Sequence, residues 1–269
     1  MRSLLFAPAN HPRRVEKALV SNADAAILDL EDAVPETEKL AARDALAAAA
    51  ALPRRTRFYV RINALSSYHG VADLPALPAN LDGVVIPKCE SAAEIGQVAA
   101  FAPKLDLLPI IETARGLAAA GEIASASPRV RRLAFGALDF ALDLGLSPGR
   151  DEAELAPYRA QLVLASRLAD REPPIDSPSP DFRDLDALKI TCLRVRRMGF
   201  QGKLCIHPDQ IAVVQAAFSP TPEEVAEAER IVAAAEAAER LGQGAVQLDG
   251  KMIDVPVVTR AQRILAAKT

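Results

Sequence analysis

One stretch decides the fold: Leu107-Leu108-Pro109-Ile110-Ile111-Glu112-Thr113-Ala114-Arg115-Gly116. Its first half is an apolar run typical of a buried strand, and this run ends at the carboxylate of Glu112. A helical pattern follows at once, from Ala114 to Ile123, with Thr113 as its expected N-cap. The stretch therefore predicts one strand–loop–helix unit with an acid where the strand ends.

A second unit of the same kind follows. The run Arg132–Leu138 is again short and mainly apolar, and it meets an acid at Asp139. Because the carboxyl ends of successive parallel strands meet at one edge of an α/β sheet, we expect Glu112 and Asp139 to project into one cleft. Two carboxylates with no nearby His or Cys suit a hard cation such as Mg²⁺. The alternative is that both are solvated loop acids.

Strand-like and helical patterns alternate through most of the chain. The strand-like runs are short and continuously apolar, as parallel strands buried on both faces should be. They are expected at Leu4–Ala7, Ala25–Leu30, Arg57–Ile62, Gly83–Ile86, Leu107–Ile111, Arg132–Leu138 and Gly202–Ile206, with a short seventh strand entered by Pro173–Asp176. The helices are expected at His11–Ser21, Thr37–Leu52, Ser91–Phe101, Ala114–Ile123, Leu155–Arg171, Asp184–Met198 and Gln210–Phe218. About eight units predict an α/β fold, a TIM-type (β/α)₈ barrel, over residues 1–219.

The chain continues past the barrel as a C-terminal extension, residues 220–269. Thr221-Pro222, followed by acids, predicts a helix start, and the helix should run to about Leu241. Asp249-Gly250 is typical of a tight hairpin turn. A last helix is expected at Val258–Ala267. We expect this helix, hairpin and helix to pack on the barrel or on a neighbouring subunit.

The composition excludes several classes of protein. Half of the 269 residues are hydrophobic, which allows a large core. A net charge of −3, with acids and bases interspersed, gives no reason to expect nucleic acid or a membrane as partner. The first apolar run is broken too soon by Pro8 for a secretory signal, and no run is long enough to span a bilayer. Three widely spaced cysteines fit neither a disulfide framework nor a zinc cluster. We therefore expect a soluble, cytoplasmic protein.

Seven motifs follow one another along nearly the whole chain. They are Arg2–Pro8, Ile27–Val34, Val60–Asn63, Ile86–Lys88, Ile111–Thr113, Phe135–Asp139 and Gly199–Gln210. Each alone is weak, but in this order they are specific. The chain resembles the HpcH/HpaI aldolase and citrate lyase β-subunit family, and more closely its CitE-like and malyl-CoA lyase branch.

The resemblance implies a TIM-type barrel with an appended C-terminal segment, in a homotrimer or hexamer. It implies Mg²⁺ as cofactor and a CoA thioester as substrate. The implied chemistry is reversible cleavage of a carbon–carbon bond in a 3-hydroxyacyl thioester, which gives an acyl-CoA and a 2-oxo acid. The partners would then be small molecules.

The resemblance also assigns the main site residues. Glu112 and Asp139 match the family's Mg²⁺ ligands. Arg61 matches its substrate-binding arginine, whose guanidinium suits a carboxylate and a developing oxyanion. Asp254 matches the acid that thioester lyases donate into a neighbouring subunit's site, where it acts as acid and base on the acyl methyl. A structural ion pair for Arg61 and an ordinary turn acid at Asp254 are the alternatives.

Two adjacent acids, Glu31 and Asp32, follow the second expected strand. We expect one of them, with Asp32 preferred, to act in catalysis by holding a metal-bound water or by orienting Arg61. A structural cap for the following helix is the alternative.

A glycine and three basic residues complete the expected site. Gly136 is expected to bind substrate through a close approach at a strand end, although a plain turn glycine would look the same. The resemblance implies that Arg13, Lys17 and Lys88 meet the phosphates of the CoA thioester, with Lys88 counted among the substrate-binding residues; ordinary surface positions are the alternative. The chain has Pro8-Ala9 where family members often have Pro-Gly, which bears on CoA affinity.

We therefore expect a Mg²⁺-dependent carbon–carbon lyase. It would cleave or form a thioester such as malyl-CoA or citramalyl-CoA, with acetyl-CoA and a 2-oxo acid as the other partners. The first alternative is a citrate lyase β-like subunit that takes its thioester from an acyl carrier protein. The others are a class II aldolase acting on free hydroxy acids and a 2-oxo acid binder without turnover.

Overall fold

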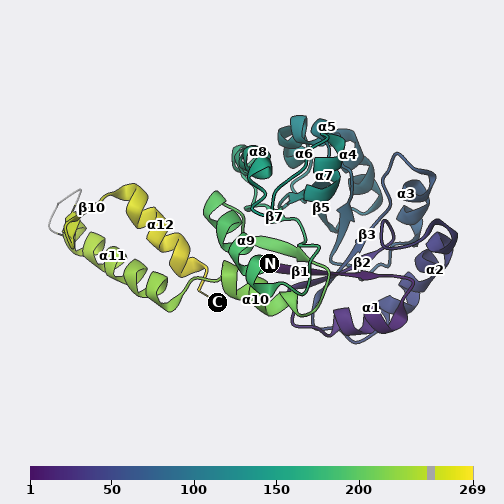
Figure 1. Cartoon of the computed structure of the whole chain (residues 1–269), viewed down its shortest axis with the longest axis horizontal. Coiled ribbons are helices and arrows are strands. Elements are labelled where there is room, and N and C mark those ends of the chain that lie inside the picture. The colour runs from purple at the N-terminus through teal and green to yellow at the C-terminus, as the bar shows by residue number, and fades with distance from the viewer. Residues whose placement is uncertain (241–245, 269) are drawn as a thin grey trace. The chain divides into compact units, whose positions relative to one another are not determined.

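The computed structural model describes residues 1–240 and 246–268 of the chain. Its first part is a closed barrel of eight parallel strands in the order β1 to β8, and β8 pairs with β1 (Figure 1). The strands are β1 Ser3–Pro8, β2 Ala25–Asp29, β3 Arg57–Arg61, β4 Gly83–Ile86, β5 Asp106–Ile111, β6 Ala134–Phe135, β7 Ile175–Asp176 and β8 Gly202–Cys205. The predicted TIM-type barrel is confirmed.

The inside of the barrel is filled by alternate residues of its strands. Side chains of successive strand residues point to opposite faces, so one set fills the barrel and the other packs against the helices. The buried inner cluster is Leu4, Ala25, Ile27, Tyr59, Val85, Leu108, Ile110, Ala134, Ile175 and Leu204. The centre is thus a packed core, so inside the barrel polar side chains can gather only at its two ends.

Helices follow the strands and surround the barrel (Figure 1). They are α1 Pro12–Leu19, α2 Lys39–Ala50, α3 Tyr68–Asp73, α4 Ala92–Phe101, α5 Ala114–Ala118, α6 Ala120–Ser125, α7 Ala137–Asp143, α8 Ala156–Leu168, α9 Leu185–Met198 and α10 Gln210–Phe218. Short 3₁₀ turns lie at Glu36–Glu38, Leu74–Ala76 and Ala153–Leu155. The expected N-cap at Thr113 is present, because its side chain accepts from the Gly116 N–H. Ser91 and Glu94 form a capping box at the start of α4.

Several local predictions differ from the structure. No helix is predicted after Asn63, but α3 forms there, capped by the Ser67 side chain. The strand expected over Arg132–Leu138 is only Ala134–Phe135, and Leu138 lies in α7. The single helix expected over Ala114–Ile123 is two helices that meet at Ala119, which lies between the poor helix formers Gly116 and Gly121. The predicted start at Thr37 lies in a 3₁₀ turn, and α2 begins at Lys39.

The chain divides into two compact units, Met1–Gln215 and Ala216–Thr269. In the second, α11 (Pro222–Arg240) and α12 (Val255–Ala266) run side by side, joined by the hairpin of β9 (Val246–Leu248) and β10 (Lys251–Ile253) (Figure 1). The domain boundary expected between residues 219 and 220 stays a prediction.

The hairpin turn has the expected form. Asp249 and Gly250 both have positive φ, 50° and 77°, as a two-residue turn of this kind requires. The last helix begins three residues earlier than predicted, at Val255, because Pro256 needs no N–H partner in a first helical turn. The predicted end of the preceding helix at Leu241 lies outside the described residues.

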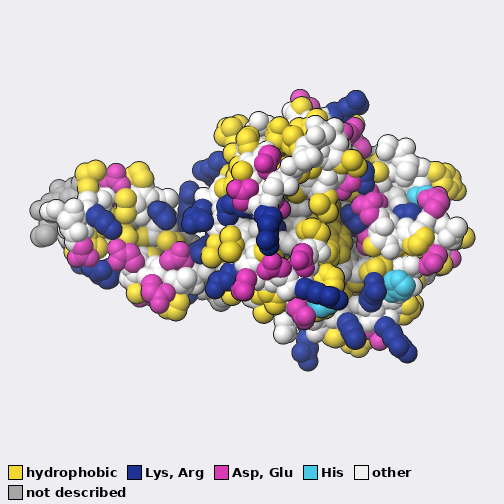
Figure 2. All heavy atoms as spheres, in the orientation of Figure 1, with side chains coloured by type: hydrophobic (Ala, Val, Ile, Leu, Met, Phe, Trp, Pro, Cys, Tyr) yellow, Lys and Arg dark blue, Asp and Glu magenta, His cyan; other side chains and the backbone are white. Residues whose placement is uncertain are grey.

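Surface charge and cysteines agree with the composition. On the face shown in Figure 2, Lys and Arg side chains are interspersed with Asp and Glu. Cys89, Cys192 and Cys205 are free and buried, and burial raises the pKa of each thiol. None of the described helices is both long and apolar enough to cross a membrane.

Candidate functional site

The pair of Arg61 and Asp29 is the best-defined part of the site. The two residues are register partners at the ends of β3 and β2. Arg61 donates from Nε and Nη2 to the two carboxylate oxygens of Asp29, each at 2.6 Å. Burial alone would raise the pKa of Asp29, but the charge and hydrogen bonds of Arg61 outweigh it and lower this pKa. The guanidinium also covers the ring of Phe6, with Cζ 4.7 Å from the ring centroid. These contacts fix the orientation of Arg61.

Two acids and a lysine surround this pair. Arg61 Nη1 lies 2.9 Å from Glu31 Oε2 and 3.5 Å from Asp32 Oδ2. Lys88 Nζ lies 2.5 Å from Glu31 Oε1 and 3.5 Å from Asp32 Oδ1. Burial has the largest effect on the pKa of Glu31 and raises it, although Arg61 and Lys88 act in the opposite direction. Both predicted acids therefore contact Arg61 and Lys88. Glu31 is the closer and is buried, while Asp32 is exposed.

Glu112 lies just after β5 and is only 3% exposed. Lys88 has a left-handed backbone conformation, with φ 46°, and its N–H donates to Glu112 Oε1 at 2.7 Å. Such conformations in residues other than glycine gather at functional sites. Burial raises the pKa of Glu112 to about 8; the charges of Glu31 and Asp139 add to the rise, and Lys88 opposes it.

Gly136 makes room for Glu112. A Cβ atom at position 136 would lie 2.2 Å from Glu112 Oε2 and 2.6 Å from Glu112 Cβ. The predicted close approach at this glycine is therefore an approach to the Glu112 side chain. Next to it, the Ala137 N–H donates to Ser177 Oγ at 3.0 Å, at the start of α7. Asp139 follows in the first turn of α7 and is half-buried.

The two acids fit a magnesium ion. Glu112 is a buried carboxyl group with a strongly raised pKa, and a second carboxylate, Asp139, adds to its negative surroundings. A divalent cation would hold such a carboxylate in its ionised form. Within residues 1–240 and 246–268, no group of three or more His, Cys, Asp or Glu side chains could hold a metal. A carboxylate pair still suits Mg²⁺, which keeps several waters and uses one or two carboxylates together with its substrate.

The remaining predicted residues lie apart from this cluster in the sequence. Arg13 and Lys17 are exposed on α1, the helix between β1 and β2. Asp254 belongs to the second unit, where it is the N-cap of α12 and its Oδ1 accepts from the Val257 N–H at 3.3 Å. The contacts thus join five of the predicted residues: Arg61, Asp32, Lys88, Glu112 and Gly136. Asp139 acts on Glu112 through its charge.

Sequence reasoning missed two residues of this region. Asp29 was not assigned, although a strand-end acid beside a strand-end arginine on the next strand predicts a pair of this kind. Ser177 also carries no assignment; it begins the proline-rich stretch Ser177–Pro180. Its bond to Ala137 joins residues 40 positions apart, so no local pattern could have revealed it.

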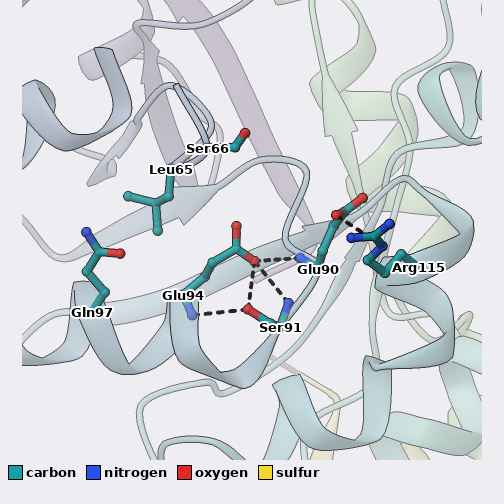
Figure 3. A pocket seen from close by; sticks show the side chains of 7 residues that line it. All are labelled: Leu65, Ser66, Glu90, Ser91, Glu94, Gln97 and Arg115. Carbon is teal, nitrogen blue, oxygen red and sulfur yellow. Dashed lines mark hydrogen bonds and ion pairs between the residues drawn. The ribbon is translucent and has the colours of Figure 1, made fainter. Parts of the chain in front are cut away.

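The barrel unit contains a cavity of about 300 Å³. Figure 3 shows its lining residues, Leu65, Ser66, Glu90, Ser91, Glu94, Gln97 and Arg115. Glu94 Oε2 accepts from the backbone N–H groups of Glu90 and Ser91, at 2.7 and 2.9 Å, so it is engaged in capping α4. The lining includes no predicted site residue. Thr113, the neighbour of Glu112, donates its hydroxyl to Glu90 of the cavity lining.

Comparison with known families identifies the class of protein. A family described as carbon–carbon bond lyases of the TIM-barrel fold matches residues 185–267. The HpcH/HpaI aldolase/citrate lyase family matches residues 2–208. Fold, acids and matches together define a barrel-type carbon–carbon lyase. The chain belongs to the HpcH/HpaI aldolase/citrate lyase family.

Individual relatives span nearly the whole chain. A (3S)-malyl-CoA thioesterase of Cereibacter sphaeroides is 40% identical, covering 98% of this chain and 93% of the relative. The mitochondrial citramalyl-CoA lyase of Rattus norvegicus is 34% identical, covering 100% of this chain and 86% of the relative. A crystal structure of protein CitE from Mycobacterium tuberculosis, in complex with magnesium, acetoacetate and coenzyme A, superposes with a TM-score of 0.85. It is 38% identical, covering 99% of this chain and 97% of the other.

Proposed function

We propose that this protein is a Mg²⁺-dependent lyase that cleaves or forms a 3-hydroxyacyl-CoA thioester, such as malyl-CoA or citramalyl-CoA. The products of cleavage would be acetyl-CoA and a 2-oxo acid. The observation that carries the proposal is the buried Glu112, which lies beside Lys88 and Asp139 at the carboxyl end of the barrel. The relatives that act on malyl-CoA and citramalyl-CoA support the choice of substrate.

The chain's own residues would hold the 2-oxo acid half of the substrate. Glu112 and Asp139 would bind the metal ion. Magnesium, when bound, would act as a Lewis acid on the carbonyl oxygen of the 2-oxo acid. Arg61 and Lys88 would face its carboxylate. A guanidinium has five N–H donors. The hydrogen bonds to Asp29 use two of them, and Nη1 forms ion pairs with Glu31 and Asp32, so Arg61 retains donors for a ligand.

Other residues would serve the thioester half. Arg13 and Lys17, exposed on α1, would meet the phosphates of CoA. Asp254 would give a proton to the carbon that becomes the acetyl methyl during cleavage, and would remove that proton during condensation. We also propose a cytoplasmic homo-oligomer, a trimer or hexamer, in which Asp254 serves a neighbouring subunit.

The test is direct product analysis. The protein is incubated with (3S)-malyl-CoA or citramalyl-CoA, with Mg²⁺ or with EDTA, and the CoA species and acids are quantified by mass spectrometry. We expect acetyl-CoA together with glyoxylate from malyl-CoA, or together with pyruvate from citramalyl-CoA, and only when Mg²⁺ is present. Glu112→Gln should lower the rate by more than about 100-fold, because it removes a charged metal ligand. Glu122→Gln, at an exposed carboxylate of α6, is the control and should remain fully active. Full activity of Glu112→Gln, or activity in EDTA, would contradict the proposal.

Thioester hydrolysis is the second candidate, because the Cereibacter sphaeroides relative at 40% identity is a thioesterase. Hydrolysis releases free CoA and malate, whereas carbon–carbon cleavage gives acetyl-CoA and glyoxylate. The same assay therefore separates the two reactions. A carrier-protein thioester would instead leave both CoA substrates untouched, and the CoA held by the CitE relative argues against it.

A further inference from the structure

Lys39 is a nearly buried lysine whose three donors are all engaged. It is the first residue of α2 and is 7% exposed. Its Nζ donates to the backbone oxygen of Leu30 at 2.8 Å, to that of Glu31 at 2.7 Å and to Asn63 Oδ1 at 2.6 Å. An ammonium group has three N–H donors, so these bonds account for all of them.

Nothing in α2 itself explains a lysine at this position. A positive charge at the first turn of a helix opposes the helix dipole. Burying an ammonium group also costs stability unless its donors are bonded. The acceptors of Lys39 are two carbonyls and an amide oxygen rather than carboxylates. The bonds must therefore be explained by what they connect.

The bonds connect the two segments that carry the Arg61 cluster. Leu30 and Glu31 follow β2, and the Glu31 side chain contacts both Arg61 and Lys88. Asn63 comes two residues after Arg61, which ends β3. Lys39 thus ties the backbone that carries Glu31 to the loop that follows Arg61.

A second residue of α2 also holds Asn63, through Asp73. Asn63 donates from its backbone N–H and from Nδ2 to Asp73 Oδ2, at 2.8 and 2.7 Å. Arg43, one turn after Lys39 on α2, donates to Asp73 Oδ1 at 2.8 Å. Asp73 is fully buried, so this chain of bonds is shielded from water and holds one geometry.

We propose that Lys39 is a positioning residue for substrate binding. It holds the Glu31 segment against the Arg61 strand, so that Arg61 and Lys88 keep the spacing that receives the carboxylate of a 2-oxo acid. Lys39 does not touch the substrate. This inference rests on the proposed function, because it assigns the 2-oxo acid to Arg61 and Lys88.

The test measures two ligands on one variant. Lys39→Met keeps the aliphatic stem and removes the three donors. Glyoxylate and pyruvate are titrated calorimetrically with Mg²⁺ present, and Mn²⁺ is titrated alone by electron paramagnetic resonance. The dissociation constant of the oxo acid should rise by about 10- to 100-fold, as on loss of other residues that orient a binding group. That of Mn²⁺ should change by less than about 3-fold, because Lys39 bonds to neither Glu112 nor Asp139.

Two further variants complete the design. Lys203→Met removes another buried lysine, bonded to Asp176, and should leave oxo acid binding unchanged, which controls for loss of a buried charge. Asn63→Ala removes a single acceptor of Lys39 and serves if Lys39→Met does not fold. It should weaken oxo acid binding in the same direction.

The outcomes separate the two claims. If the wild-type protein binds the oxo acid and the Lys39 or Asn63 variant binds it equally well, this inference alone is overturned. An equal loss of Mn²⁺ affinity would also overturn it, since it would mean that the whole site collapses. A wild-type protein that binds no oxo acid with Mg²⁺ would overturn the proposed function, and this inference with it.

Discussion

At the scale of single residues, the site depends on how tightly Glu112 is enclosed. It is buried, accepts one backbone N–H from Lys88, and lies against the bare Cα of Gly136. The sequence predicts that a strand-end acid and a strand-end glycine matter here. It does not predict that they touch, because contact depends on the register of β5 and β6, where Ile111 pairs with Phe135.

Gly136→Ala should displace the Glu112 carboxylate. The new Cβ would meet Glu112 Oε2 at 2.2 Å and Glu112 Cβ at 2.6 Å, and the second atom cannot move without the backbone. We expect the Mn²⁺ dissociation constant to rise by about 10-fold or more, measured by electron paramagnetic resonance.

Gly121→Ala is the matched control for that substitution. Apart from its chain neighbours and the backbone of its own helix, no atom of the described residues lies within 4 Å of a Cβ built there, and the residue is inside α6. It should leave metal binding unchanged and raise stability by up to about 1 kcal/mol, because alanine favours helix over glycine. If Gly136→Ala binds metal as tightly as the wild type, then either Glu112 is not a metal ligand or the site accommodates the added methyl group.

At the scale of elements, the strands were predictable and the short helices were not. Parallel strands buried on both faces leave continuous apolar runs, and this is why the bounds of β4 match the prediction. The helix α3 is six residues long, opens with Ser67 and contains Gly70, so its composition is that of a loop. It forms because Gly70 lets the chain pass close to the backbone of Ala64, a tertiary contact that sequence pattern does not record.

The site was predictable only in part, and for a related reason. Glu112, Asp139 and Arg61 stand out because charged residues interrupt apolar runs at strand ends. Lys39 sits in an alanine-rich helical pattern and looks like a surface residue, although its side chain is buried between two loops. Long-range bonds of this kind follow from the closed barrel and not from local periodicity.

A buried ionic cluster joins β7, β8 and α8. Asp176, fully buried, lies 2.8 Å from Arg159 Nε and 2.5 Å from Lys203 Nζ. Burial acts to raise the pKa of Asp176, but Lys203 and Arg159 outweigh it and the pKa is lowered. Asp176→Asn should cost about 3–5 kcal/mol of unfolding free energy at pH 7, measured by urea denaturation, because two buried cations lose their shared partner.

The same substitution should change how stability depends on pH. An aspartate in an unfolded chain has a pKa of about 3.9, and the folded value of Asp176 lies below this. Its contribution is therefore complete above about pH 5 and is lost as pH falls toward the folded pKa. The difference in the free energy of unfolding between wild type and Asp176→Asn should therefore become smaller as pH falls from 7 to about 3.5. Arg150→Met breaks an exposed pair with Asp184 and should alter neither stability nor its pH dependence. A difference in unfolding free energy that stays constant with pH would contradict a lowered pKa for Asp176.

At the scale of the whole molecule, the chain is built from two compact units that carry different parts of the proposed machinery. The barrel unit holds Glu112, Asp139, Arg61 and Lys88, and the second unit holds Asp254. In the second unit the Asp254 carboxylate caps α12 by accepting from Val257 at 3.3 Å. Helix capping alone would explain an acid at this position. The proposed catalytic role therefore needs an experiment whose result helix capping cannot produce.

Subunit complementation is that test. Glu112→Gln and Asp254→Asn are each expected to be inactive, and asparagine is as good an N-cap as aspartate, so α12 should stay intact. If Asp254 serves a neighbouring barrel, co-refolded mixtures contain sites with an intact barrel from one variant and an intact Asp254 from the other. Random mixing in equal amounts should restore roughly a quarter of wild-type activity, since each half of a site is intact with even odds.

The control for complementation uses two defects in the same unit. Glu112→Gln mixed with Arg61→Met leaves every barrel damaged, so activity should stay at the level of the single variants. Recovery in this control would mean that subunits exchange more than one segment. Full activity of Asp254→Asn alone would reduce Asp254 to a helix cap. Absence of recovery with Asp254→Asn, in mixtures that mass spectrometry shows to be hetero-oligomers, would place Asp254 in the site of its own chain. The measurement thus decides whether the barrel is a complete catalyst or one half of a site shared between subunits.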